Sequence, residues 1–185
     1  IELAKYFTSN QVLGKDIIVN QNDTYSDCKN KILAQISEVC KATANSLDLT
    51  VFSKIIKIID KADTIYLLGV GSSGTAAMEL QQKLIKLYKK VFFIQDSQMN
   101  LLSMITMNKN DVLIAFSYSG YTKIIEVSVK AAKNHGATVV GIIGNTYSPI
   151  ALASDYWILT PGIEREESFG AISSRYAQQY VNDLI

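Results

Sequence analysis

The chain has 185 residues, 48% of them hydrophobic, which suits one globular domain with a sizeable core and argues against a disordered chain. Its formal net charge of +1 provides no large basic surface, so nucleic-acid binding by this chain alone is not expected. It contains no signal-peptide pattern and no apolar run near the roughly 20 residues of a membrane span, which predicts a cytoplasmic protein without membrane contact.

The first 22 residues differ from the rest of the chain. Residues 1–7 have helical character, and residues 8–22 form a polar stretch around Gly14 that is typical of a linker. The chain also starts at Ile1 without a methionine. We therefore interpret residues 1–22 as the tail of an upstream domain and a linker, and residues 23–185 as one domain.

Two helices are expected before the first strand. Asp23 or Thr24 could cap the first, whose apolar residues recur at three- and four-residue steps, and the second begins near Thr50. Cys28 and Cys40 lie twelve positions apart in the first helix, about 18 Å at the usual rise, so they cannot bridge to each other. Their separation agrees with a reducing compartment.

From Thr64 onward, strands and helices alternate. Strands are predicted at 64–70, 91–94, 111–117, 138–143 and 155–159, and helical segments at 74–89, 97–106, 122–134 and 149–153. A last helix carries Ile172, Tyr176, Tyr180 and Leu184 at four-residue spacing. This pattern predicts an α/β three-layer sandwich in which helices cover both faces of a five-stranded parallel sheet of order 2-1-3-4-5.

The turn after the third strand is rich in hydroxyl groups. Ser117, Ser119 and Thr122 offer three of them where a helix begins, and Gly120 lets the backbone come close to a ligand. Free N–H groups and the positive end of the helix dipole favour an anion at such a position. A phosphate group is the predicted guest, and a Ser/Thr N-cap without a ligand is the alternative for this turn taken alone.

The turn after the first strand has a similar character. It reads GVGSSG over 69–74 and is followed by small residues that suit close helix packing. In the predicted strand order, the first and third strands are neighbours at the switch point where such sheets bind ligands. The two turns are therefore expected to share one crevice, which favours a ligand over two independent caps.

The first turn also matches the dinucleotide fingerprint, with Gly69, Gly71 and Gly74 followed by Asp96 after 22 positions. A dinucleotide gives no role to the hydroxyl groups of the second turn, so a compact monophosphate is favoured, and the dinucleotide remains an alternative. A mononucleotide P-loop is excluded because Thr75 stands where that motif needs lysine.

The paired motifs GVGSS at 69–73 and SYSGYT at 117–122 resemble those of the sugar isomerase (SIS) domain, a phosphosugar-binding fold. The segment AISSRYAQ at 171–178 is similar to the last helix of this domain in RpiR-type bacterial transcriptional regulators. In such regulators an N-terminal helix-turn-helix domain binds DNA, while the SIS domain senses a sugar phosphate and forms a homodimer or higher homo-oligomer. Tyr121 departs from the charged residue often found after the glycine, which leaves sugar selectivity open.

The resemblance implies a set of ligand-binding residues. It assigns direct contact with the phosphosugar to Ser72, Ser73, Ser117, Tyr118, Ser119, Gly120 and Thr122. Further contacts are assigned to Gly71, Lys123 and Glu167. No metal, cofactor or catalytic residue is predicted.

Because SIS domains also occur in aldose-ketose isomerases, that activity remains an alternative, and it would require a general base. The sole histidine, His135, is expected at the far end of the helix that starts at Thr122, about 20 Å from the phosphate end. Three glutamates on the loop after the last strand are the remaining candidates for a base: Glu164, Glu166 and Glu167.

Overall fold

The computed structural model describes residues 19–162 and 171–185. Two helices, α2 (Tyr25–Ser46) and α3 (Leu49–Lys61), precede the alternating part. The elements that follow are β1 (Ile65–Leu68), α4 (Ser72–Lys86), β2 (Val91–Phe93), α5 (Ser97–Ser103), the 3₁₀ helix η2 (Met104–Thr106), β3 (Val112–Ser117), α6 (Lys123–Asn134), β4 (Thr138–Ile143), α7 (Pro149–Ala153), β5 (Tyr156–Leu159) and α8 (Ile172–Leu184).

The five strands form one parallel sheet in the order β2-β1-β3-β4-β5, which confirms the predicted fold class. Every residue of β1 and of β3 is buried, as expected for central strands covered on both faces. In the ladder between them, Leu68 of β1 pairs with Ala115, and β3 runs on to Ser117, which pairs with β4. Continuing the register places the turn after β1 beside the end of β3.

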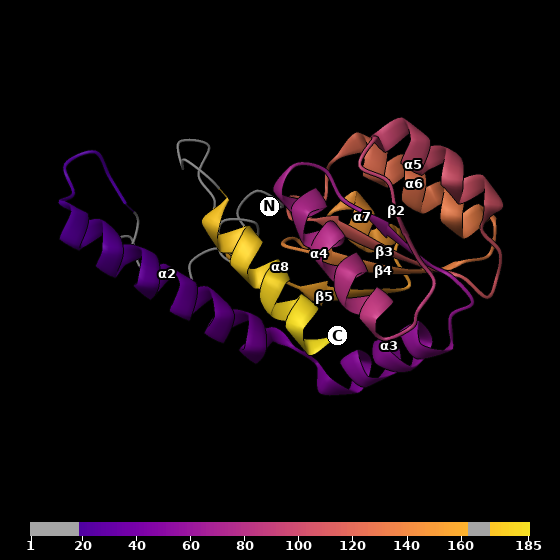
Figure 1. Cartoon of the computed structure of the whole chain (residues 1–185), viewed down its shortest axis with the longest axis horizontal. Coiled ribbons are helices and arrows are strands. Elements are labelled where there is room, and N and C mark those ends of the chain that lie inside the picture. Colours follow the sequence, from indigo (N-terminus) through magenta and orange to yellow (C-terminus); the bar gives the residue numbers. More distant parts are fainter. Residues whose placement is uncertain (1–18, 163–170) are drawn as a thin grey trace.

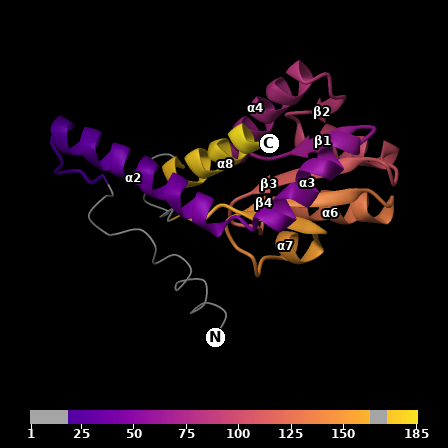
Figure 2. The same cartoon turned by 90° about the horizontal axis from the view of Figure 1, so that it is seen from below.

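Helices cover the sheet from both sides and form the outer layers (Figures 1 and 2). On one side, α3, α4 and α8 pack on alternate strand residues such as Leu67, Ile114 and Ile142. On the other side, η2, α6 and α7 pack on the strand residues between them, such as Leu68 and Ala115. The alternation of side chains along each strand therefore builds two separate hydrophobic layers.

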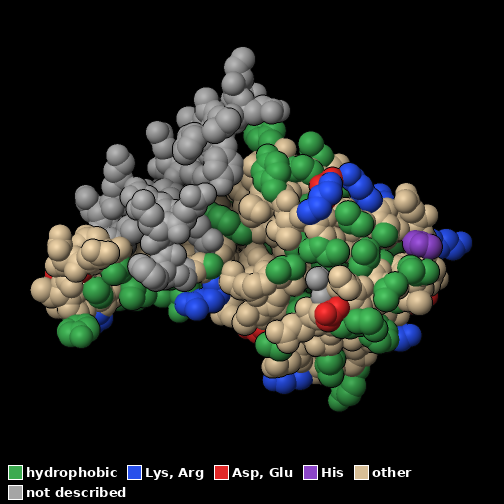
Figure 3. Space-filling model, turned by 90° about the horizontal axis from the view of Figure 1, so that it is seen from above, with side chains coloured by type: hydrophobic (Ala, Val, Ile, Leu, Met, Phe, Trp, Pro, Cys, Tyr) green, Lys and Arg blue, Asp and Glu red, His purple; other side chains and the backbone are tan. Residues whose placement is uncertain are grey.

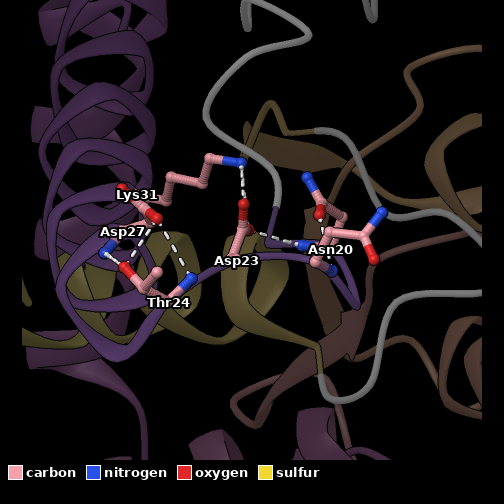
Figure 4. A network of polar contacts seen from close by, with 6 residues as sticks. Asn20, Asp23, Thr24, Asp27 and Lys31 are labelled. Carbon is pink, nitrogen blue, oxygen red and sulfur yellow. Dashed lines mark hydrogen bonds and ion pairs between the residues drawn. The ribbon is translucent and has the colours of Figure 1, made fainter.

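Helix α2 extends beyond the body of the domain (Figures 1 and 2). It begins at a capping box in which the Thr24 side chain accepts from the Asp27 N–H and the Asp27 side chain accepts from the Thr24 N–H. Just before it, Asp23 accepts hydrogen bonds from the Asn20 N–H at 2.7 Å and from Lys31 Nζ at 2.7 Å (Figure 4). These contacts tie the start of α2 to the residues that precede it.

The last helix differs from its predicted pattern. The regularly spaced Ile172, Tyr176 and Tyr180 are only half-buried, and Leu184 is exposed. The fully buried face of α8 instead consists of Ser173, Ser174, Ala177, Gln178, Val181 and Asn182. This face packs between α2 and α4, where small and amide side chains find hydrogen-bond partners, so burial there does not follow hydrophobicity.

Candidate functional site

The candidate site lies where β1 and β3 end. The two strands are neighbours in the sheet, and each is followed by a short turn and a helix, α4 and α6 respectively. Because the strands are parallel, both turns lie at the same edge of the sheet, which is where doubly wound sheets bind ligands.

Glycines shape the turn after β1 in two ways. A Cβ atom on Gly69 would lie 2.5 Å from the Ser73 carbonyl oxygen, and one on Gly74 would lie 3.0 Å from the Gly69 carbonyl oxygen. Gly71 instead has φ +61° with no atom within 4 Å of an added Cβ. The turn is thus closed tightly against α4 by Gly69 and Gly74, while Gly71 faces open space. Helix α4 begins at Ser72, two residues earlier than predicted, because Gly71 serves as its N-cap.

The two serines of this turn differ in environment. Ser72 is half-buried, whereas Ser73 is buried and its Oγ accepts a hydrogen bond of 3.1 Å from Gln178 Nε2 on α8. Because the hydroxyl acts as acceptor in this contact, its own hydrogen can be directed to a ligand. Gln178 therefore fixes where that donor lies.

The hydroxyl groups of the second turn take part in shaping it. Ser117 is buried; its Oγ accepts from the Gly120 N–H at 3.2 Å and lies 3.4 Å from Thr122 Oγ1. Ser119 is exposed, and its Oγ accepts from the Tyr121 N–H at 3.3 Å. The Ser117 hydroxyl donates its hydrogen to Thr122 Oγ1, whereas Ser119 acts only as an acceptor in its N–H contact, so the Ser119 hydrogen can be donated to a ligand. The predicted phosphate contacts of these residues remain predictions.

The structure requires glycine at position 120 for a reason beyond the ligand approach that we expected. It has φ +74°, and a Cβ atom there would lie 2.0 Å from Ser148 Oγ, the side chain that caps α7. The Gly120 carbonyl also accepts from the Ile150 N–H at 3.3 Å. The glycine is thus required for packing of the turn on α7, in addition to any approach to a ligand.

Tyr118 makes hydrogen bonds to residues outside the motif. Its hydroxyl donates to the Gly162 carbonyl beyond β5, and its carbonyl accepts from the Gly144 N–H at 2.8 Å. Both contacts hold the second turn against the loops that follow β4 and β5.

The helices that start at the two turns lack side-chain caps. Among the described helices, α2, α3, α5 and α7 each begin with a side chain that accepts a backbone N–H. By contrast, α4, α6 and α8 begin without one. The first N–H groups of α4 and α6, together with their helix dipoles, are therefore available to an anion at the sheet edge.

Charge near the second turn comes from Lys123, the first residue of α6. Its ammonium lies 3.2 Å from Glu126, which also pairs with Lys130 at 2.5 Å. Hydrogen bonds from Lys130, and then from Lys123, lower the pKa of Glu126 below its ordinary value. On the face shown in Figure 3, one group of basic side chains adjoins an acidic one and the others are scattered, so they do not merge into one large basic surface.

The alternative interpretations depend on five residues, of which the structure describes Asp96 and His135. Asp96 Oδ1 accepts from the N–H groups of Gln98 and Met99, so one oxygen of the predicted ribose ligand serves as the N-cap of α5. His135 follows the last residue of α6 and is exposed, which confirms its place at the end of the helix remote from the turn. Glu164, Glu166 and Glu167 lie outside the described residues.

Two buried amides on α8 belong to the surroundings of the site and were missed by the sequence reasoning. Gln178 contacts Ser73, and Asn182 Nδ2 donates to the Ala76 carbonyl of α4 at 2.9 Å. Among the described residues, the carbonyl oxygens Gln178 Oε1 and Asn182 Oδ1 have no hydrogen-bond partner. In the sequence, the spacing of Gln178 and Asn182, four positions apart in the predicted last helix, could have indicated that one face of this helix is polar and buried.

Neither a membrane span nor a metal cluster is found in the described part of the chain. No helix in residues 19–162 and 171–185 has the length and hydrophobicity needed to cross a membrane. Within the same ranges, no three side chains of His, Cys, Asp or Glu come together in a way that could hold a metal ion.

Fold and site together define a doubly wound α/β domain with paired hydroxyl turns at its switch point. Comparison with protein-family models matches residues 58–185 to the SIS domain, and the chain belongs to this family. This confirms the resemblance inferred from the two motifs.

The curated relatives are named as regulators. An uncharacterized HTH-type transcriptional regulator of Haemophilus influenzae is 29% identical over 185 residues, which are all of this chain and 64% of the relative. Another from Clostridium perfringens is 30% identical over 168 residues, which are 90% of this chain and 60% of the relative. The chain thus spans less than two thirds of the length of both relatives.

Solved structures share the fold. The Vibrio vulnificus NanR protein complexed with ManNAc-6P superposes with a TM-score of 0.81 at 22% identity, covering 86% of this chain and 61% of that one. The sugar isomerase domain of an RpiR transcription factor from Sphaerobacter thermophilus gives a TM-score of 0.75 at 16% identity, covering 85% and 88%.

Proposed function

We propose that this chain is the effector domain of a bacterial transcriptional regulator of the RpiR type, and that it senses a sugar phosphate without catalysing a reaction. The observation that carries the proposal is the pair of uncapped helices, α4 and α6, that start beside hydroxyl-bearing turns on neighbouring strands. The relatives named as transcriptional regulators support the regulatory role, and the ManNAc-6P complexed with NanR supports the ligand class.

In this proposal the phosphate lies between the two turns. The first N–H groups of α4 and α6 and the hydroxyls of Ser73, Ser119 and Thr122 donate to its oxygens, and Lys123 offsets part of its charge. Tyr118 and Ser117 hold the second turn in place through the hydrogen bonds described above. DNA contact is assigned to a helix-turn-helix part of the full-length protein, and the effector domain acts as a cytoplasmic homodimer.

The proposal is tested by calorimetric titration with a fixed panel: ManNAc-6P, glucosamine 6-phosphate, fructose 6-phosphate, ribose 5-phosphate and inorganic phosphate. We expect at least one sugar phosphate to bind and to raise the melting temperature, because a ligand that binds only the folded state stabilises it. Ser119→Ala should weaken binding at least fivefold, whereas Ser37→Ala on the exposed side of α2 should not. Absence of binding across the panel, with stabilisation by NAD instead, would overturn the proposal.

Isomerase activity is the competing function, and some proteins of the same fold are named as isomerases. The described residues place the only histidine at the remote end of α6, so a base for proton transfer would have to come from elsewhere. Incubation with each sugar phosphate of the panel, followed by chromatography, should return the substrate unchanged. Conversion of an aldose phosphate into its ketose, abolished by Glu166→Gln or Glu167→Gln, would show that the chain is an isomerase and would overturn the sensor proposal.

A further inference from the structure

The two turns of the candidate site are both connected to α2, the helix that extends from the domain. The contacts run through α8 and through Gly162, neither of which the proposed ligand contacts include. The links through α8 are buried and the Tyr118–Gly162 hydrogen bond is partly buried, and together they form two routes from the sheet edge to one helix.

The first route starts at Ser73 on α4. Gln178 donates to its hydroxyl at 3.1 Å, and the Gln178 side chain is fully buried on α8. Four residues further along α8, Asn182 donates to the Ala76 carbonyl at 2.9 Å. Helices α4 and α8 thus run in parallel, joined at two successive turns by amide hydrogen bonds.

This route reaches α2 at the start of α8. Gln35 Nε2 of α2 donates to Ser173 Oγ at 3.0 Å, and both residues are buried. The chain of contacts therefore passes from the β1 turn through α4 and α8 to α2, with a buried amide at each helix junction.

The second route starts at Tyr118 in the turn after β3. Its hydroxyl donates to the Gly162 carbonyl. A Cβ atom on Gly162 would lie 2.8 Å from Ser173 Cβ, 3.3 Å from Tyr118 Oη and 3.5 Å from Val39 Cγ2. The turn, α8 and α2 therefore meet at this one glycine, and displacement of Tyr118 moves the backbone on which Val39 and Ser173 rest.

The inner face of α8 is more polar than packing alone requires. Four polar residues of this face are at most 2% exposed: Ser173, Ser174, Gln178 and Asn182. The amide oxygens of Gln178 and Asn182 have no hydrogen-bond partner within residues 19–162 and 171–185. Buried hydrogen bonds fix orientation, whereas apolar contacts tolerate sliding. This interface has two properties that suit an element coupling the ligand site to α2. Its hydrogen bonds fix one geometry, and some of its buried amide oxygens are left without a hydrogen bond among the described residues.

We propose that Gln178 and Tyr118 are positioning residues that report the occupancy of the sugar-phosphate site to α2, through the Gln35–Ser173 hydrogen bond and the Gly162 junction. This inference rests on the proposed function and adds the element, helix α2, to which ligand binding is transmitted. Helix α2 continues for ten residues, about 15 Å, from Gln35 back to Tyr25. A tilt at the α8 contact is therefore amplified at its first residues, which the Asp23–Lys31 pair and the capping box connect to the preceding chain (Figure 4).

The test combines calorimetry with hydrogen exchange on the full chain, using whichever member of the panel above binds most tightly. In the wild type we expect saturating ligand to slow amide exchange at least threefold in residues 35–46 of α2. Gln35→Met should bind the ligand within threefold of the wild type and lose this protection. Gln178→Met should weaken binding at least fivefold, because Ser73 is no longer held. Gln82→Met on the exposed side of α4 is the matched control and should behave as the wild type.

Each other outcome separates the two proposals. Binding without a change of exchange in α2 of the wild type would overturn the coupling and leave the sensor intact. Retained protection in Gln35→Met would also overturn it, and Ser173→Ala removes the same hydrogen bond from the α8 side if Gln35→Met does not fold. Absence of binding by every sugar phosphate in the panel would overturn the sensor, and the coupling with it.

Discussion

Replacing Gly120 by alanine tests how the second turn is built. Gly120 has φ +74°, and an alanine Cβ would lie 2.0 Å from Ser148 Oγ and 2.3 Å from Ser148 Cβ. The left-handed backbone costs alanine about 1–2 kcal/mol. Displacing Ser148 adds about 1 kcal/mol for the lost N-cap of α7 and about 1–3 kcal/mol for strained packing. We therefore expect Gly120→Ala to lower the free energy of unfolding by roughly 3–6 kcal/mol.

Gly71→Ala provides the matched control. Gly71 also has positive φ, +61°, but no atom lies within 4 Å of an added Cβ. The Gly71 backbone, with φ +61° and ψ −130°, lies in a region that is nearly restricted to glycine, so only this conformational cost applies and a loss of about 1–3 kcal/mol is expected. Both variants are measured by urea unfolding at equilibrium, with the slope compared to confirm two-state behaviour. Equal losses for the two variants would refute the steric role of Ser148 and the account of the turn given above.

Three further predictions concern surface and cap residues. Asp96→Ala removes the N-cap of α5, so it should lower the free energy of unfolding in urea by about 1 kcal/mol. The affinity for the sugar phosphate should stay within twofold. A larger loss of ligand affinity in Asp96→Ala would favour the dinucleotide alternative. Hydrogen bonds from Lys31 lower the pKa of Asp23, and those from Thr24 lower the pKa of Asp27. Their stabilisation of α2 is present above the unfolded carboxyl pKa of about 3.9 and is lost as pH falls through the lower folded values. Backbone ¹³C shifts of residues 23–31 should therefore lose helicity on acidification below about pH 4, and shifts that stay constant down to global unfolding would contradict this. Lys83 pairs with Asp183 and Glu79, and its pKa is raised chiefly by the hydrogen bond to Asp183, yet these groups are partly exposed. Lys83→Met should lower the free energy of unfolding by less than about 1 kcal/mol, because solvent screens these ion pairs. A larger loss in urea unfolding would contradict this.

The sheet was predictable because its strands follow a simple rule. Central strands covered on both faces are largely apolar, and β3 shows this over 112–116 and β4 over 139–143, in the sequence and in the structure. The strand order was predicted from the common doubly wound arrangement of such sheets and was confirmed. Segment ends were less accurate, since local geometry decides them. The positive φ at Gly71, for example, starts α4 earlier than residue spacing indicated.

The candidate site was predictable in part. The motifs placed both turns at neighbouring strands, because β1 and β3 are fixed as neighbours by the fold. The partners of individual side chains were not predictable, since they come from remote parts of the chain. Ser73 meets Gln178, 105 positions away, and Tyr118 meets Gly162, 44 positions away. Such contacts depend on how α8 and the loop after β5 pack, which no local pattern encodes.

Helix α8 leads to a last prediction, which separates stability from signalling. In the wild type, Gln178 donates one hydrogen bond to Ser73, and its Oε1 has no partner in the part of the chain that the structure describes. Replacing it by methionine loses a hydrogen bond of about 1 kcal/mol and removes an unpaired buried oxygen that costs about 1–3 kcal/mol. The two effects nearly cancel, so Gln178→Met should change the free energy of unfolding by less than about 2 kcal/mol in either direction.

The same variant should bind a sugar phosphate more weakly, because the Ser73 hydroxyl loses the amide that orients it. A loss of affinity with nearly unchanged free energy of unfolding would show that Gln178 contributes to ligand binding rather than to folding. Urea unfolding and calorimetry on one protein preparation measure both quantities. A loss of unfolding free energy above about 3 kcal/mol would instead make Gln178 a structural residue, since a cost of that size is what disruption of a tightly packed core produces.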